Sequence, residues 1–235
     1  LLLFTLGFGA ARPEIKSGNA HSGNAVPQGR GESAASDATT HDGNQSARLA
    51  IVETGWTADA NGYIHYGIGI KNQSSTMTVK YPTVKIVGYS NSGSVVFSDE
   101  RVFGPIGPQQ TIYYGDQVGN GTPPARVEFE PTEPKDYAIT AASEAPTLEV
   151  SGTSAKKDGY GTTSFSGSLT LKSAPEEFDA DQLALSVILR NNDGRIVAGY
   201  TDYITCPASG ASTGFSIDVY DPPAFSSYEV YAAQQ

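Results

Sequence analysis

The sequence is poor in the residues that build disulfide frameworks, zinc sites and nucleophilic active sites. Its 235 residues include one cysteine, Cys206, and three histidines, of which His21 and His41 lie outside any strand-like stretch. A single cysteine cannot form an internal disulfide, and these few scattered ligands cannot supply a structural zinc site. We interpret Cys206 as a small buried hydrophobic residue. We expect no catalytic residue, no cofactor and no bound metal.

Positive charge is also scarce. The chain has 15 Lys and Arg against 25 Asp and Glu, which gives a formal net charge of −10 at pH 7. No run of basic residues offsets this charge locally. Because phosphate backbones and anionic lipids repel such a chain, we do not expect nucleic acid as a partner.

A mostly apolar run, LLLFTLGFGAAR, opens the sequence and is shorter than the about 20 residues that a membrane-spanning helix needs. We interpret residues 1–11 as the end of a signal peptide, with Gly9 and Ala11 as the small residues of its cleavage site. The alternative is that residues 1–11 are the last part of a membrane anchor. We expect no membrane contact apart from this possible anchor. Both alternatives place the rest of the protein outside the cytoplasm.

Residues 12–46 contain few side chains that could drive burial. Ser, Gly, Asn, Ala, Asp and Thr dominate this segment, and the sequence SGNA occurs in it twice. Burial cannot offset the conformational entropy that ordering this segment would cost. We therefore predict a disordered, flexible linker.

After the linker the sequence repeats itself. Residues 89–96 read YSNSGSVV, and residues 190–197 read RNNDGRIV. In both copies a polar turn that ends in glycine separates two apolar, alternating runs, which predicts a β-hairpin. Further matches pair GIGIKN with SLTLKS, NGY with DGY, VEF with YEV, and Asp116 with Asp218. The chain therefore contains two homologous units, which we place at residues 47–141 and 145–235.

Each unit carries short alternating strands with turn signals about every 8–12 residues and no helical period, as in an immunoglobulin-like sandwich. We predict an all-β protein with two tandem immunoglobulin-like antiparallel β-sandwich domains after the linker. The junction AASEAP is short and ends in Pro146. We expect it to restrict the relative motion of the two domains.

The order of strand, polar-glycine hairpin, proline-containing loop and late alternating strand resembles the FxLYD-type domains of bacterial exported proteins. Where that family has Phe-x-Leu-Tyr-Asp, this chain reads IVGYS at residues 86–90 and VILRN at residues 187–191. Only Tyr89 in the first copy and Leu189 in the second retain the motif. The resemblance implies an exported bacterial protein and no defined activity.

The remaining histidine and the repeated acids give little support to chemistry. His65 lies in the strand-like YIHYGIGI, and a catalytic pair with Cys206 would have to form between the two domains. Asp116 and Asp218 are interpreted as hydrogen-bond acceptors of the fold. The alternative is a Ca²⁺ site that Asp221 would help to build, although Ca²⁺ wants six or more oxygen ligands.

Aromatic residues are the best candidates for binding. Trp56, the single tryptophan, lies at the end of the first predicted strand and could stack on a sugar ring or anchor a partner. The alternative is that Trp56 plugs the end of the sandwich. Tyr113 and Tyr114 are adjacent in one strand, so we expect one of the two to be exposed.

These observations lead to one functional expectation and two alternatives. We expect a monomeric, non-catalytic extracellular or cell-surface protein with a binding, adhesion or spacer role toward an unknown protein or glycan. The first alternative is a carbohydrate- or cell-wall-binding accessory module that uses Trp56. The second is a hydrolase whose site the sequence does not reveal.

Overall fold

The computed structural model describes residues 49–235, which belong to one compact unit. The predicted signal peptide or anchor at residues 1–11 and the predicted linker at residues 12–46 lie outside these residues. Over residues 49–235 the chain forms strands and a single 3-10 turn, η1 (Asp136–Ala138). In this range no helix has the length and apolar character to cross a membrane.

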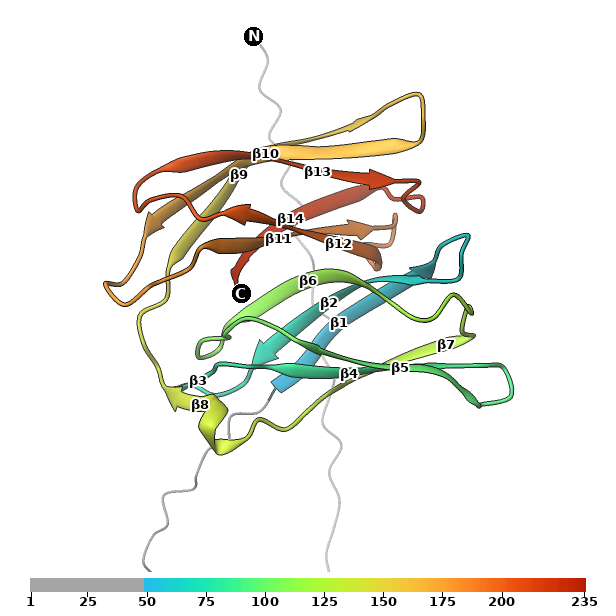
Figure 1. The fold of residues 1–235 in the computed structure, drawn as a ribbon, viewed down its shortest axis with the longest axis horizontal. Coiled ribbons are helices and arrows are strands. Elements are labelled where there is room, and N and C mark those ends of the chain that lie inside the picture. The colour runs from blue at the N-terminus through green and yellow to red at the C-terminus, as the bar shows by residue number, and fades with distance from the viewer. Residues whose placement is uncertain (1–48) are drawn as a thin grey trace, which may run out of the picture. The chain divides into compact units, whose positions relative to one another are not determined.

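The first half of the described chain forms two sheets that face each other (Figure 1). One sheet has the order β1-β2-β6, with β1 (Leu49–Ala58), β2 (Ile64–Asn72) and β6 (Thr111–Val118). The other has the order β5-β4-β7, with β4 (Thr83–Tyr89), β5 (Val95–Val102) and β7 (Arg126–Pro131). The short strands β3 (Met77–Val79) and β8 (Ile139–Ala141) pair with each other. We call this half the first sandwich.

The second half repeats the arrangement. One sheet has the order β9-β10-β13, with β9 (Thr147–Lys157), β10 (Thr162–Ser173) and β13 (Ser212–Tyr220). The other has the order β12-β11-β14, with β11 (Gln182–Arg190), β12 (Ile196–Thr205) and β14 (Ser227–Gln234). All strand pairs within these sheets are antiparallel. The prediction of an all-β chain with tandem β-sandwiches is confirmed.

The repeated phrase forms the same hairpin in both sandwiches. Between β4 and β5, the Ser90 amide donates to the carbonyl of Ser94, and between β11 and β12 the Asn191 amide donates to that of Arg195. The turn glycines, Gly93 and Gly194, have φ values of 83° and 77°, which ordinary side chains disfavour. The predicted hairpins are therefore confirmed.

Two of the predicted repeat matches are displaced. Asp59 and Asp158 are the equivalent turn residues, because each accepts two backbone hydrogen bonds from the turn that follows it. This equivalence replaces the match of NGY with DGY. By this alignment Ser164 corresponds to His65; Asp218 lies opposite Ser164, whereas Asp116, which binds Arg101 on β5, lies opposite Tyr66, so the two acids are offset by one residue.

Each sandwich buries its own apolar core, and two strands are covered on both faces. Alternate residues of β2 are fully buried in the first core: Ile64, Tyr66, Ile68 and Ile70. Burial of such a side chain contributes about 1.5–3 kcal/mol. In β11 seven consecutive residues, LALSVIL, are all buried. A strand with one face in water would alternate, so β11 has a second covered face.

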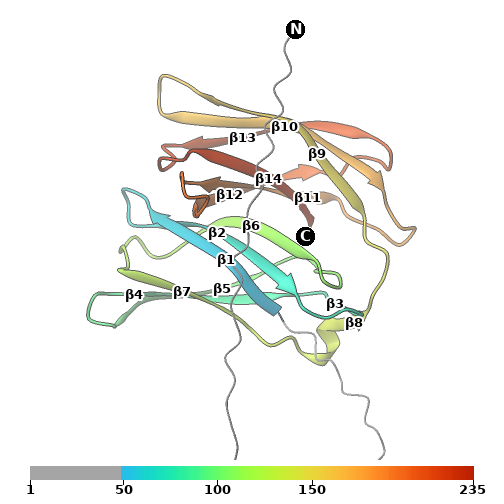
Figure 2. The same cartoon turned by 180° about the vertical axis from the view of Figure 1, so that it is seen from behind.

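That second cover is the other sandwich. Figures 1 and 2 show four stacked layers, in which the β1-β2-β6 sheet lies against the β12-β11-β14 sheet. Glycine lines this contact. A Cβ atom on Gly55 would lie 1.8 Å from the carbonyl oxygen of Ile196, and one on Gly115 would lie 2.2 Å from the carbonyl carbon of Gly199. At these two glycines the backbones touch with no side chain between them, which is closer packing than the short junction led us to expect.

Hydrogen bonds also join the two inner sheets. The guanidinium of Arg190 binds both carboxylate oxygens of Glu53 in the other sandwich, at 2.5 and 3.0 Å. The Thr201 hydroxyl donates to the carbonyl oxygen of Gly115 at 2.5 Å. The hydroxyl of Thr57 donates to the carbonyl oxygen of Val197 at 2.7 Å. These bonds fix one register between the sandwiches.

We predict that Gly55→Ala destabilises the protein by about 1–3 kcal/mol or more, because the added methyl overlaps the carbonyl oxygen of Ile196. The measurement is urea unfolding followed by far-UV circular dichroism and by the fluorescence of Trp56, which reports on the first sandwich. The matched control is Gly159→Ala, where a Cβ has no neighbour within 4 Å and the change should cost less than about 0.5 kcal/mol. Equal unfolding midpoints for the two variants would contradict the backbone contact.

Candidate functional site

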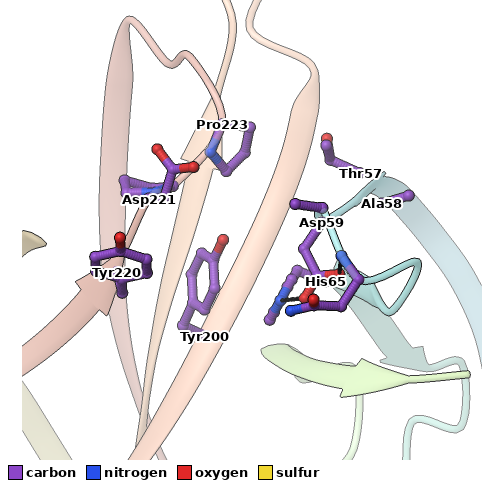
Figure 3. Close-up of a pocket in the computed structure, with 11 residues that line it drawn as sticks. Thr57, Ala58, Asp59, His65, Tyr200, Tyr220, Asp221 and Pro223 are labelled. Carbon is purple, nitrogen blue, oxygen red and sulfur yellow. Dashed lines mark hydrogen bonds and ion pairs between the residues drawn. The ribbon is translucent and has the colours of Figure 1, made fainter. Parts of the chain in front are cut away.

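A pocket of about 390 Å³ opens where the two inner sheets end (Figure 3). The first sandwich supplies the end of β1, the turn after it and His65 of β2. The second supplies Tyr200 of β12 and the segment from Tyr220 to Pro223 after β13. The volume lies at the small end of the about 300–1,000 Å³ typical of ligand pockets. Neither sandwich forms this pocket alone.

Asp59 organises the wall from the first sandwich. Its Oδ1 accepts hydrogen bonds from the backbone amides of Asn61 and Tyr63, at 2.9 and 3.0 Å. Its Oδ2 lies 3.3 Å from Nε2 of His65. Burial raises the pKa of Asp59, but these two amides and His65 outweigh it, so the pKa lies below its ordinary value of 3.8.

Tyr200 joins the two walls. Its ring packs on the ring of His65 across the interface, with centroids 5.0 Å apart and planes tilted by 33°. Burial, followed by the negative charges of Asp59 and Asp221, raises the pKa of Tyr200 to about 12. The Tyr200 hydroxyl therefore stays protonated at neutral pH and lies in the negative potential of two carboxylates, one from each sandwich.

The wall from the second sandwich is built on an unusual backbone. Asp221 has a φ of 45°, in the left-handed region that non-glycine residues other than Asn, Asp and His rarely adopt. Its amide donates to the carbonyl oxygen of Gly161 at 2.9 Å, which anchors the turn. Pro222 and Pro223 follow and restrict the backbone further. The ring of Tyr220, 77% exposed, stands at the mouth of the pocket.

A second hollow of about 270 Å³ shares His65 and Tyr200 with the pocket. Asp116, Asp202 and Asp218 lie among its lining residues. Neither hollow is lined by a lysine or an arginine. The end of the interface that carries both hollows is therefore acidic.

The structure places Trp56 away from this pocket. Trp56 lies on β1, is partly buried and packs against the core of the first sandwich. It does not line the pocket, although its neighbours Thr57 and Ala58 do. This placement favours the alternative in which Trp56 is part of the core, while a ligand contact at Trp56 stays a prediction.

The other candidate residues do not assemble into a catalytic or metal centre. Cys206 is partly buried, burial raises the pKa of its thiol, and it lines neither hollow. Within residues 49–235 no three His, Cys, Asp or Glu side chains lie together as metal ligands. Asp221 lines the pocket rather than a Ca²⁺ site with Asp218.

The expectation that Tyr113 or Tyr114 is exposed is wrong. Tyr114 is 5% exposed in the first core, and Tyr113 stacks on Tyr231 of the other sandwich with centroids 4.5 Å apart. The prediction assumed that one face of β6 contacts water. The second sandwich covers that face instead.

The residues that line the pocket have no sequence signature. Tyr200 and the adjacent pair Tyr220 and Asp221 lie in separate segments of the sequence, and they line one pocket with His65 only in the folded chain. A weak signal was present in Asp221-Pro222-Pro223, because an acid before two prolines indicates a rigid turn. The chain matches no known family of proteins and no curated protein.

We predict that Asp59 makes the stability of the protein depend on pH in the acid range. Because the folded state lowers the pKa of Asp59, its contribution is present above the unfolded pKa and is lost as pH falls through the folded pKa. Urea midpoints measured between pH 7 and pH 2 should fall less steeply for Asp59→Asn than for the unchanged protein.

The control for this prediction is Asp158→Asn, in the equivalent turn of the second sandwich, where no histidine contacts the carboxylate. It should leave the acid slope closer to that of the unchanged protein. An Asp59→Asn variant with an unaltered slope would show that the bonds to Asp59 do not depend on its charge.

Proposed function

We propose that this protein is a non-catalytic binding protein of the cell exterior, and that its ligand site is the pocket between the two sandwiches. The observation that carries the proposal is that both sandwiches contribute to one pocket while their backbones are in contact. A pocket held between rigid walls loses little conformational entropy when a ligand binds. A structure of this kind suits recognition.

The chemistry of the lining also supports binding. Tyrosine rings, carboxylates, an amide and prolines surround the pocket. Such linings give a ligand flat apolar surfaces and a few fixed polar partners. No activated nucleophile accompanies His65, whose Nε2 lies at the carboxylate of Asp59, so we propose binding rather than catalysis.

We include in this proposal where the protein is located and which family it resembles. The apolar run at residues 1–11 and the resemblance to FxLYD-type domains favour an exported bacterial protein that faces outward as a monomer. The net charge of −10 favours a protein or glycan partner over nucleic acid. A spacer role is the natural second candidate, because two sandwiches whose inner sheets are in backbone contact resist bending.

The test is binding of the full chain to an array of glycans, wall polymers and matrix proteins. We predict a saturable ligand whose affinity falls about tenfold or more in Tyr220→Ala, since an aromatic contact is often worth more than 1 kcal/mol. The control is Tyr160→Ala, which removes a tyrosine that is 88% exposed and lines neither hollow. Binding that both variants retain would remove the pocket from the proposal.

We predict that Trp56→Ala costs stability and leaves ligand affinity unchanged. Loss of a partly buried tryptophan from the first core should lower the free energy of unfolding by about 2–4 kcal/mol. Urea unfolding followed by circular dichroism measures the stability, and the array measures the affinity. Unchanged stability with lost glycan binding would favour the accessory-module alternative centred on Trp56.

A further inference from the structure

The charge on the walls of the pocket restricts which ligands it can accept. Asp59 and Asp221 approach it from opposite sides, and no lysine or arginine lines it. The hollow beyond Tyr200 adds the carboxylates of Asp202 and Asp218, and that of Asp116, which is paired with Arg101. An anionic ligand would therefore meet repulsion from both sandwiches, which also excludes phosphorylated and sulfated groups.

The two carboxylates in the pocket differ in what they already bind. Asp59 uses both oxygens, one for the turn amides and one for His65. Asp221 makes no side-chain hydrogen bond within the described residues, and its backbone is held by Gly161 and by the prolines after it. Asp221 therefore presents, on a restrained backbone, an exposed carboxylate whose two oxygens can accept hydrogen bonds from a ligand.

Aromatic rings complete the arrangement. Figure 3 shows Tyr200 and Tyr220 on the same side of the pocket as Asp221. Aromatic faces attract cations through their quadrupole. Tyr200 keeps its proton at neutral pH because burial raises its pKa to about 12, so its ring adds no full negative charge of its own.

We propose that the pocket binds an alkylammonium group, held by the Asp221 carboxylate and the rings of Tyr200 and Tyr220. The inference rests on the proposed function, because it names the ligand chemistry of the same site. The volume of about 390 Å³ is large enough for a small ligand that carries such a group. The ammonium group can come from an amino sugar or from an acyclic amine.

The experiment compares ligands that differ in one charge. Isothermal titration of the full chain uses a glucosamine trisaccharide, which carries free amines, and its N-acetylated counterpart, which is neutral. Choline and spermidine serve as amines without a sugar ring. We expect the glucosamine trisaccharide to bind at least about tenfold more tightly than the N-acetylated form, and salt to weaken it.

Two variants assign this binding to the site. Asp221→Asn removes the charge and keeps the backbone, because asparagine tolerates a positive φ as well as aspartate does. We expect it to weaken amine binding about tenfold. The control is Asp193→Asn, an exposed acid in the turn between β11 and β12. It should leave the affinity unchanged.

The outcomes separate this inference from the proposed function. Binding of choline and spermidine as well as the trisaccharide supports an ammonium site for acyclic amines, and binding of the trisaccharide alone supports an amino-sugar site. Equal affinity for the two trisaccharides, or no amine binding at millimolar concentration, overturns the inference. In that case a neutral ligand from the array that Tyr220→Ala abolishes would leave the proposed function standing.

Discussion

Contact between the backbones of the two inner sheets governs this structure. Side chains usually hold face-packed sheets about 10 Å apart. Here Gly55 and Gly115 meet the backbone of the second sandwich directly, so at these positions no side chain separates the two sheets. A contact of this kind accepts only one register, since a shift of one residue would bring side chains into backbone atoms. The pocket between the sandwiches therefore inherits a fixed width.

The duplicated sandwiches meet through different sheets. The β1-β2-β6 sheet of the first sandwich contacts the β12-β11-β14 sheet of the second, which corresponds to β5-β4-β7 of the first. The contact is thus heterologous, and the two sandwiches carry different residues where it forms. Arg190, which binds Glu53, occupies the place of Tyr89, and Gly199 occupies that of Ser98.

Some of the acidic residues of this chain lie together at the pocket. A net charge of −10 is ordinary for a soluble surface, where carboxylates are spread over loops and strands. Around Tyr200 the fold gathers carboxylates from both sandwiches, of which Asp116 is paired with Arg101. No lysine or arginine lines either hollow, and this is the basis for proposing a cationic ligand.

The sequence by itself determined the all-β class, the duplication and the hairpins, because alternation of apolar residues and glycine-containing turns are local signals. It could not determine that β6 is covered on both faces. The residues on its second face do not show, from their types alone, whether they face another sheet or water. The tertiary structure alone decided that the glycines of β1 and β6 meet a second backbone. It also decided that His65 packs on Tyr200 and lines one pocket with Asp221, because their approach depends on a long-range register that no short segment encodes.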